Sequence, residues 1–249
     1  MSTSNPLEFS RCGLALSVLA FFVTVGPVLA DPPDFQKIRA GRRVTAVRTT
    51  APHEIDGVLN EPDWPLAAPA TDFIQQYPSE GRPASMRSEV RFLYDHDTLY
   101  VGATLDDPDP QHGPITNELV RDFSARDGDV FVIVLDTFHD ERNSNSFQTN
   151  PDGAVRDSQA YDDGRQNNQN WDGVWRVKTA RSATGWSVEM AIPFKTLRFH
   201  RGEAQVWGLN IFRLVRRLNE GAMWVPVPRQ FNQFKVSYAG VLDRPMRRL

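Results

Sequence analysis

Residues 166–175 combine two kinds of side chain that suit a hydroxyl-rich ligand. The segment reads Gln-Asn-Asn-Gln-Asn-Trp-Asp-Gly-Val-Trp, so planar amides precede Trp171 and Trp175. A flat indole packs against the apolar face of a sugar ring, and amide, guanidinium or carboxylate groups exchange paired hydrogen bonds with its hydroxyls. The segment therefore predicts sugar recognition by stacking and hydrogen bonding.

Core packing is the alternative role for every tryptophan. Trp186 alternates with apolar residues along its segment, which is the period of a strand with one buried face, and Trp64 is similar. We expect both in a core. Trp171 lies beside a polar loop and fits either role, whereas Trp224 fits the core better than a binding surface.

Two acidic clusters suggest a hard cation. Asp127 and Asp129 flank Gly128, and residues 106–109 contain three aspartates. Carboxylates on loops are the ligands that calcium prefers, although no segment has EF-hand spacing. The sequence therefore leaves two readings open: a structural calcium on Asp127 and Asp129, or carboxylates that cap turns and stay solvated.

Catalytic motifs are absent from the sequence. It has no Gly-x-Ser-x-Gly, no His-Glu-x-x-His and no phosphate-binding glycine loop. The five histidines fall in predicted loops or strand edges, none at ligand spacing from another: His53, His96, His112, His139 and His200. Glu189 and Arg213 stand inside apolar strands and could pair with each other. We expect such an ion pair to be structural rather than to line a binding groove. Catalysis would need a second carboxylate across a cleft, so the chain is expected to be no enzyme.

Residues 1–30 have the order of a cleaved export signal. Arg11 precedes an apolar run, Gly26-Pro27 breaks it, and small residues lead to Ala30, so we expect cleavage there and a periplasmic, outer-membrane-associated or secreted product. A retained anchor helix is the alternative. The only cysteine, Cys12, lies in this segment, so the mature chain can form no disulfide or thiolate metal site. A net charge of −3 in the 249-residue chain gives no electrostatic basis for binding nucleic acid.

The elements that must position these residues are short strands. Alternating apolar residues predict hairpins at 88–105 and 174–192, the continuous apolar run 130–135 predicts a strand buried on both faces, and 206–217 predicts a long strand. About ten strands with turn signals every 8–12 residues or so predict an all-β fold, an antiparallel sandwich of jelly-roll type. Residues 75–88, 139–150 and 162–170 are expected to be loops.

The sandwich is expected to occupy residues 44–243. A flexible lead at 31–43 precedes it, and a basic tail at 244–249 follows it.

Five pieces of the chain together resemble carbohydrate-binding module family 9-like domains. The first is Ile-Asp-Gly-Val-Leu-Asn-Glu-Pro-Asp-Trp at 55–64, which combines a tight turn, a capped helical turn and a tryptophan. The others follow in the family's order at 126–137, 147–153, 171–175 and 185–194. The resemblance covers roughly 55–242 and implies an extracytoplasmic β-sandwich that binds an oligo- or polysaccharide, as an accessory to carbohydrate catabolism.

The resemblance also implies site residues. Members that bind sugars hold the ring between two tryptophans, and Trp171 with Asn168 is the best match, with Gln148 and Arg121 weaker. The second tryptophan is expected within 73–83, which contains only Phe73 and Tyr77 as aromatic residues. Family members often contain structural calcium.

The sequence is also compatible with two other functions. Residues 207–220 resemble a subgroup of envelope proteins in which a predicted outer-membrane barrel follows the domain. This favours a structural or interaction domain without a sugar site, whose partner is a barrel or another envelope protein. Some similar sandwiches hold haem, for which Met86, Met223 and His139 are the axial candidates.

Overall fold

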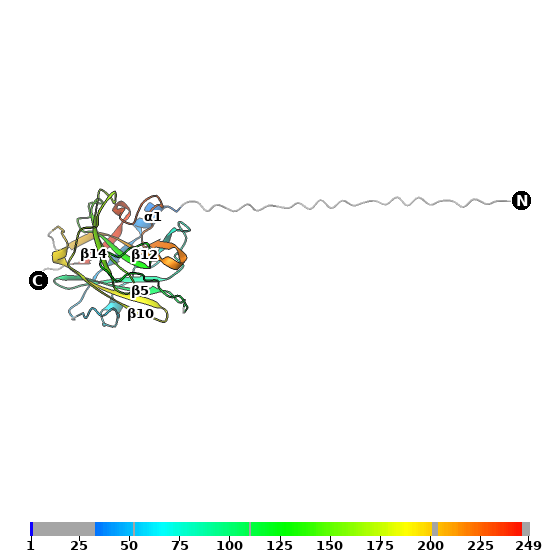
Figure 1. Cartoon of the computed structure of the whole chain (residues 1–249). Coiled ribbons are helices and arrows are strands. Elements are labelled where there is room, and N and C mark those ends of the chain that lie inside the picture. The colour runs from blue at the N-terminus through cyan, green and yellow to red at the C-terminus, as the bar shows by residue number, and fades with distance from the viewer. Residues whose placement is uncertain (2–32, 52, 110, 201–203, 246–249) are drawn as a thin grey trace. The chain divides into compact units, whose positions relative to one another are not determined.

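Two β-sheets pack face to face in the computed structural model, which describes residues 1, 33–51, 53–109, 111–200 and 204–245 (Figure 1). The first sheet has nine strands. Seven of them follow the order β1 (Arg43–Thr45), β14 (Gly240–Pro245), β12 (Ala204–Val215), β6 (Val130–Asp136), β7 (Ser144–Thr149), β8 (Val155–Tyr161) and β9 (Gln166–Asn168). The other two lie beside this series, where β13 (Glu220–Met223) pairs with β12 and β3 (Ile74–Tyr77) pairs with β13. The second has five, in the order β10 (Arg176–Ser182), β11 (Gly185–Pro193), β5 (Thr98–Asp106), β4 (Ser88–Tyr94) and β2 (Val47–Arg48). The predicted β-sandwich is confirmed.

Helical structure is limited to short pieces. They are α1 (Phe35–Ala40) and the 3-10 turns η1 (Trp64–Leu66), η2 (Phe194–Thr196), η3 (Arg216–Leu218) and η4 (Val236–Tyr238). Strands pair antiparallel except where β1 joins β14 and β2 joins β4.

The main core fills the space between the sheets. Phe92, Val101 and Met190 of the second sheet meet Phe131 and Ile133 of the first, and all five are fully buried. Every residue of β6 is buried because its other face is covered by a second apolar cluster. This explains the continuous apolar run of that strand and confirms its predicted burial on both faces.

The predicted hairpin at 88–105 is β4 and β5, and the one at 174–192 is β10 and β11. Residues 139–150, expected to be a loop, contain β7 instead. Most of its buried positions carry polar groups, of which Ser146, Gln148 and Thr149 find partners inside the protein, and Ser146 Oγ lies 2.8 Å from Ser158 Oγ. A strand of this kind lacks the apolar period on which the expectation was based. The loops expected at 75–88 and 162–170 likewise contain part of β3 and all of β9.

Residues 33–43, expected to be part of a flexible lead, contain α1. Asp34 accepts a hydrogen bond from the backbone N–H of Lys37 (3.0 Å), which caps the helix. Arg39 Nε donates to the carbonyl of Ala239 (2.9 Å), and Phe35 packs edge-on against Tyr238. These contacts fix the helix to the end of the chain that forms β14.

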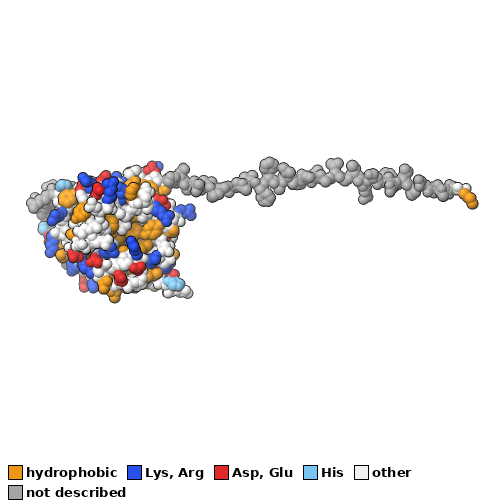
Figure 2. All heavy atoms as spheres, turned by 45° about the horizontal axis from the view of Figure 1, so that its top comes forward, with side chains coloured by type: hydrophobic (Ala, Val, Ile, Leu, Met, Phe, Trp, Pro, Cys, Tyr) orange, Lys and Arg blue, Asp and Glu red, His pale blue; other side chains and the backbone are white. Residues whose placement is uncertain are grey.

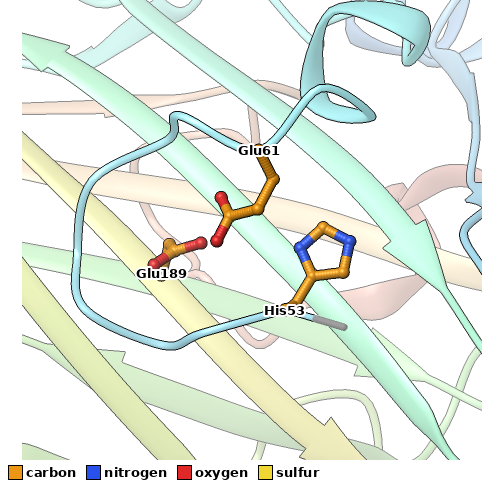
Figure 3. A group of neighbouring side chains, drawn as sticks. All are labelled: His53, Glu61 and Glu189. Carbon is orange, nitrogen blue, oxygen red and sulfur yellow. The ribbon is translucent and has the colours of Figure 1, made fainter. Parts of the chain in front are cut away.

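The entry segment, residues 55–64, crosses the outer face of the second sheet. Trp64 is buried there in a separate apolar cluster with Tyr100. Gly102 leaves room for it, because an added Cβ would lie 2.8 Å from the Trp64 ring. Beside it, the carboxylate of Glu189 from β11 lies under the segment with Glu61 and His53 (Figure 3). The motif that begins the family resemblance is therefore a packing element on one sheet.

The predicted signal peptide, apart from Met1, and residues 246–249 of the predicted tail lie outside the described residues. Among the described residues, no helix has the length and apolar character needed to span a membrane. Acidic and basic side chains are interspersed over the face seen in Figure 2, in keeping with the small net charge.

Candidate functional site

A row of amides crosses three neighbouring strands of the first sheet. Asn145 of β7 is opposite Gln159 of β8, which is opposite Asn168 of β9. Residues directly opposite in an antiparallel pair share a face, and Asn145 shares the face of the core residue Phe147 two positions on. Along this face Phe147 is fully buried, Asn145 and Gln159 are half-buried, and Asn168 is exposed. The core face of the sheet thus becomes an accessible polar surface at this edge.

The amide row lies beside a groove of about 540 Å³. This volume falls within the roughly 300–1,000 Å³ of small-molecule sites. Its lining carries aromatic, amide and cationic groups: Phe138, Tyr161, Trp171, Asn143, Asn145, Gln159, Lys195 and Arg198, among others. Tyr161 Oη donates to Gln159 Oε1 (2.6 Å), which orients that amide towards one hydrogen-bonding pattern.

Trp171 forms one wall of the groove. Its indole is half-buried and packs edge-on against Phe147, with ring centroids 6.0 Å apart. A second hollow of about 330 Å³ shares Trp171 and Lys195 with the first and adds Val174. Gly173 permits this ring position, since an added Cβ would lie 2.9 Å from the indole. A half-buried ring supported from behind is a stacking platform whose position is fixed before a ligand arrives.

A buried carboxylate anchors the loop that carries Trp171. Asp157 on β8 is fully buried and accepts from Trp175 Nε1 (2.6 Å), the Gly173 N–H (3.3 Å) and the Arg121 guanidinium (2.9 Å). Burial raises the pKa of Asp157, and the hydrogen bond from Trp175 and the charge of Arg121 oppose that rise. Arg121 also binds Asp172 (2.9 Å), so one guanidinium joins the strand to the loop.

The predicted sugar-binding residues therefore divide into two groups. Trp171 and Asn168 lie at the accessible surface beside the groove. Trp175 and Gln148 are buried, with exposed fractions of 8 % and 3 %, and each side chain has a protein partner. Arg121 is occupied by two carboxylates. Burial or pairing leaves these last three residues little capacity for a ligand, and Trp175 and Arg121 bind Asp157 instead.

The segment 73–83 supplies no exposed aromatic ring. Phe73 is buried in the main core, and Tyr77 packs against Gly221 at the end of β13. The other aromatic side chains of the groove are Phe138 and Tyr161, with exposed fractions of 38 % and 39 %. Sequence reasoning missed them together with Asn145 and Gln159. The signal that would have found three of them is strand register, since Asn145 lies on β7 and Gln159 and Tyr161 lie on β8, whereas Phe138 follows the end of β6.

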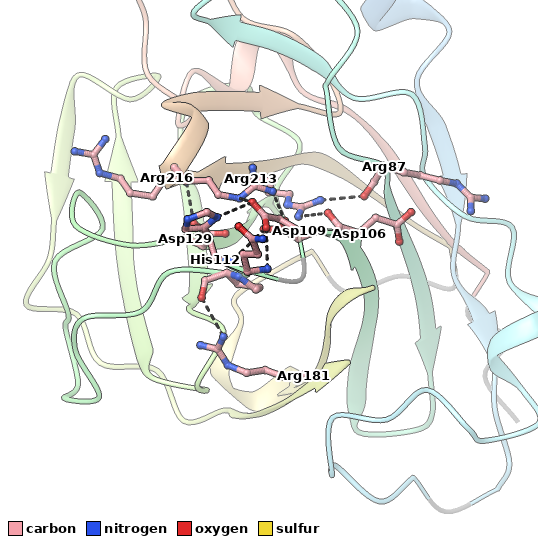
Figure 4. Close-up of polar contacts among 12 residues, drawn as sticks. Arg87, Asp106, Asp109, His112, Asp129, Arg181, Arg213 and Arg216 are labelled. Carbon is pink, nitrogen blue, oxygen red and sulfur yellow. Dashed lines mark hydrogen bonds and ion pairs between the residues drawn. The ribbon is translucent and has the colours of Figure 1, made fainter. Parts of the chain in front are cut away.

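The predicted calcium ligands Asp127 and Asp129 lie in different surroundings. Asp127 is exposed, while Asp129 is buried and accepts from the Arg216 N–H (2.8 Å) beside the Arg213 guanidinium (Figure 4). Neither belongs to a group of three or more carboxylate or histidine ligands among the described residues. Asp129 thus already faces the countercharge of Arg213, although its Oδ2 accepts no hydrogen bond, and a structural calcium on these two residues stays a prediction.

The pair expected between Glu189 and Arg213 is not formed. Glu189 accepts from the backbone of the entry segment, whereas Arg213 donates to the carbonyls of Arg87 (2.9 Å) and Asp106 (2.6 Å). Met223, an axial candidate for haem, is fully buried, and its sulfur accepts from Asn210 Nδ2 at 3.9 Å. That sulfur is therefore enclosed by the protein rather than presented to a cofactor.

Known structures share this fold. A family 9 carbohydrate-binding module from Caldicellulosiruptor kristjanssonii in complex with cellotriose is 17 % identical, with a TM-score of 0.54 over 83 % of this chain and 95 % of that one. One in complex with glucose is 15 % identical, with a TM-score of 0.58 over 83 % and 97 %. A Bacteroides uniformis ATCC 8492 protein is 11 % identical, with a TM-score of 0.61 over 82 % and 99 %.

The sequence itself supports the same relationship. No curated protein matches the chain at a significant level. The family model described as carbohydrate family 9 binding domain-like matches residues 55–215, more than half of the chain, from the entry segment to the end of β12. The match contains the amide row, the groove aromatics and the anchored tryptophan loop, and the chain belongs to the carbohydrate family 9 binding domain-like family.

Proposed function

We propose that this chain is a non-catalytic module that binds an oligo- or polysaccharide in the groove beside Trp171. The observation that carries the proposal is the half-buried indole, supported by Phe147, next to the amide row of Asn145, Gln159 and Asn168. The indole takes the apolar face of a sugar ring, and the amides take its hydroxyls. The sugar complexes of two structures with this fold support the same class of ligand.

The charge of the groove favours a sugar that carries a carboxylate. Lys195 and Arg198 both line it, and no Asp or Glu is among its described lining residues. Cations without an opposing acid attract an anion and discriminate against like charge. We therefore expect a uronic-acid oligosaccharide to bind more tightly than a neutral one of the same length.

Calorimetric titration with two trisaccharides tests both parts of the proposal. Cellotriose serves as the neutral ligand and a trigalacturonate as the acidic one. Trp171→Ala is expected to weaken both at least tenfold, because removal of a stacked ring costs more than about 1.4 kcal/mol. Lys195→Gln is expected to weaken only the acidic ligand. Phe231→Ala is the matched control, an aromatic with an exposed fraction of 37 % that is not part of the groove lining.

The outcomes separate the two statements. Binding that survives in Trp171→Ala, or that falls equally in Phe231→Ala, contradicts the groove. Equal affinities for the two trisaccharides contradict only the preference for acidic sugars.

A structural or interaction domain is the second candidate. It is favoured by the segment 73–83, where Phe73 is buried and no aromatic ring is presented for a second stacking contact. Capture of an envelope protein by the wild-type chain, without affinity for any glycan on an array, would support this candidate over sugar binding.

The absence of a catalytic role is supported by the position of the carboxylates. Glu61 and Glu189 are the acidic side chains that lie together in the one ligand cluster of the described residues, and Glu189 is fully buried beneath Gly57. A polysaccharide cannot reach that carboxylate, and retaining hydrolysis needs both carboxylates at the sugar.

We further propose export, with cleavage after Ala30, from the order of charged, apolar and small residues in 1–30. Mass spectrometry of the exported protein should find Asp31 as the first residue, and retention of the leader would refute this.

A further inference from the structure

Three side chains with metal-binding atoms meet on the outer face of the second sheet. His53 and Glu61 come from the entry region and Glu189 from β11, and one ligand atom of each lies within 4.8 Å of the others. Figure 3 shows the two carboxylates directed at each other with the imidazole beside them. The cluster lies on a different sheet from the groove and uses none of its residues.

Two atoms of this cluster are buried without a partner. Glu189 is 0 % exposed, and its Oε1 accepts no hydrogen bond, and His53 Nδ1 likewise has no partner. An unpaired polar atom in a protein interior costs about 1–3 kcal/mol. Both residues belong to a cluster in which one ligand atom of each lies within 4.8 Å of the others, and this suggests a group that satisfies both.

The remaining atoms of the three side chains are all held by the protein. Glu189 Oε2 accepts from the N–H groups of Asp56 and Gly57, both at 3.0 Å. Glu61 Oε2 accepts from Trp64 Nε1 at 3.0 Å. Partners of this kind, which hold the far side of each ligand, are characteristic of metal sites because they orient the ligands before the ion binds.

A hydrogen-bond chain fixes the tautomer of His53. Thr49 Oγ1 donates its proton to Asp63 Oδ2, so it accepts from His53 Nε2, which lies 3.0 Å away. The Nε2 atom therefore carries the imidazole proton, and Nδ1 presents its lone pair to the cluster. The Asp63 carboxylate polarises the Thr49 hydroxyl, which in turn accepts from His53 Nε2. This chain makes the opposite nitrogen, Nδ1, a stronger ligand for a metal.

We propose that His53, Glu61 and Glu189 bind a divalent first-row transition metal of the zinc class. An imidazole nitrogen with two carboxylates suits zinc, whereas calcium takes six to eight oxygen ligands. Two carboxylates also neutralise the charge of a divalent ion in a buried setting. Because Glu61 lies in the entry segment, His53 just before it and Glu189 on β11, the ion ties this part of the chain to the sheet and acts structurally.

A shared proton between the two carboxyl groups is the competing account. Burial raises the pKa of Glu189 to about 7, so this group can hold a proton when no ion is present. A protonated pair would satisfy the carboxylates without any metal, and it would leave His53 Nδ1 unpaired. Metal titration separates the two accounts.

The test uses the full chain, stripped with EDTA, dialysed and titrated with ZnCl2. We expect one equivalent of zinc to bind, and a zinc concentration 100-fold above Kd to raise the unfolding midpoint by roughly 5–10 °C. Calcium at the same concentration should leave the midpoint unchanged. Glu61→Gln and His53→Gln should each abolish the zinc-dependent rise, whereas His96→Gln, whose exposed imidazole contacts only Asp97, should retain it.

The proposal is overturned if no zinc binds, if calcium gives the same rise, or if the rise persists in both Glu61→Gln and His53→Gln. Circular dichroism of the two variants shows whether they fold, and if either does not, the spectrum of bound cobalt in the wild-type chain decides. Visible d–d bands of a site with nitrogen and oxygen ligands support the proposal, and their absence refutes it. Sugar affinity should be the same with and without zinc, so the two proposals fail separately.

Discussion

Removing the Asp157 carboxylate should affect both the stability of the chain and the position of Trp171. Its oxygen accepts from Trp175 Nε1 (2.6 Å), the Gly173 N–H (3.3 Å) and Arg121 (2.9 Å), so it anchors two points of the loop that carries the indole. In Asp157→Ala, the buried Trp175 N–H loses its acceptor, which costs about 1–3 kcal/mol. The Arg121 side chain is 44 % exposed and can bind water instead, so loss of its ion pair with Asp157 adds little to the cost.

The net cost of Asp157→Ala should be about 1–3 kcal/mol, or roughly 2–12 °C in the unfolding midpoint. Asp157→Asn should cost about 1 kcal/mol or less, because its amide oxygen still accepts from Trp175. Only the alanine variant should weaken oligosaccharide binding, by roughly 3–10-fold, since the indole must then be ordered when the ligand binds.

The raised pKa of Asp157 makes the stability of the wild-type chain depend on pH, and the direction of that dependence can be worked out. Burial raises the pKa of Asp157 above 3.8, so the folded state binds the proton more tightly than the unfolded state. The stability that this group contributes is therefore complete below the ordinary pKa and is lost as pH rises through the raised one. The side chain of Asp157→Asn cannot titrate. As pH rises from the ordinary pKa of Asp157 through the raised one, the free energy of unfolding of this variant should therefore increase relative to that of the wild type.

Urea denaturation at several pH values, with calorimetric titration of the sugar, measures all three expectations. The reasoning is refuted if Asp157→Ala stays within about 0.5 kcal/mol of wild type. Equal costs for the alanine and asparagine variants would show that the charge, and not the acceptor, holds the loop.

Two further substitutions test the packing of each sheet. Gly102→Ala should cost about 1–3 kcal/mol in urea denaturation, because its Cβ would lie 2.8 Å from the Trp64 ring, whereas Gly41→Ala, with its nearest atom at 3.7 Å, should be nearly neutral. Arg213→Met should cost about 3–5 kcal/mol, because buried Asp129 loses its countercharge, and adding Asp129→Asn should recover part of that cost. Equal costs for the two glycine variants, or no recovery in the double variant, would contradict these assignments.

The sequence predicted those parts of the fold in which the apolar pattern reports burial. The hairpin at 88–105 alternates and the run at 130–135 is continuous, and both became strands. The run is buried on both faces as expected, whereas Leu93 and Tyr100 on the outer face of the hairpin are also buried because the entry segment covers them. β7 was missed because its buried residues other than Phe147 are serine, glutamine and threonine, and Ser146, Gln148 and Thr149 find hydrogen-bond partners inside the protein. Hydropathy cannot distinguish a polar residue that is satisfied inside a sheet from one that is solvated in a loop.

The candidate site was predicted only in the part that is local in sequence. Trp171 and Asn168 stand three positions apart, and both lie beside the groove. Asn145 and Gln159 join them through strand register, which a single sequence does not specify between distant segments. Trp175 looked equivalent to Trp171, but the hydrogen bond from its indole to Asp157 turns it inward. His53 was set aside because no other histidine lies at ligand spacing from it, whereas the structure brings it to Glu61 and Glu189.

The two polar clusters of this molecule occupy sites with opposite constraints. The amide row lies where the core face of the first sheet becomes accessible, so its side chains can change with the ligand at little cost to folding. The cluster of His53, Glu61 and Glu189 lies at the entry segment, where a buried polar atom without a partner lowers the stability of the fold. Substitution should therefore alter sugar specificity far more readily than it alters the entry segment. This accounts for a chain that keeps the fold motif at 55–64 but has no tryptophan within 73–83, where the family resemblance leads us to expect one.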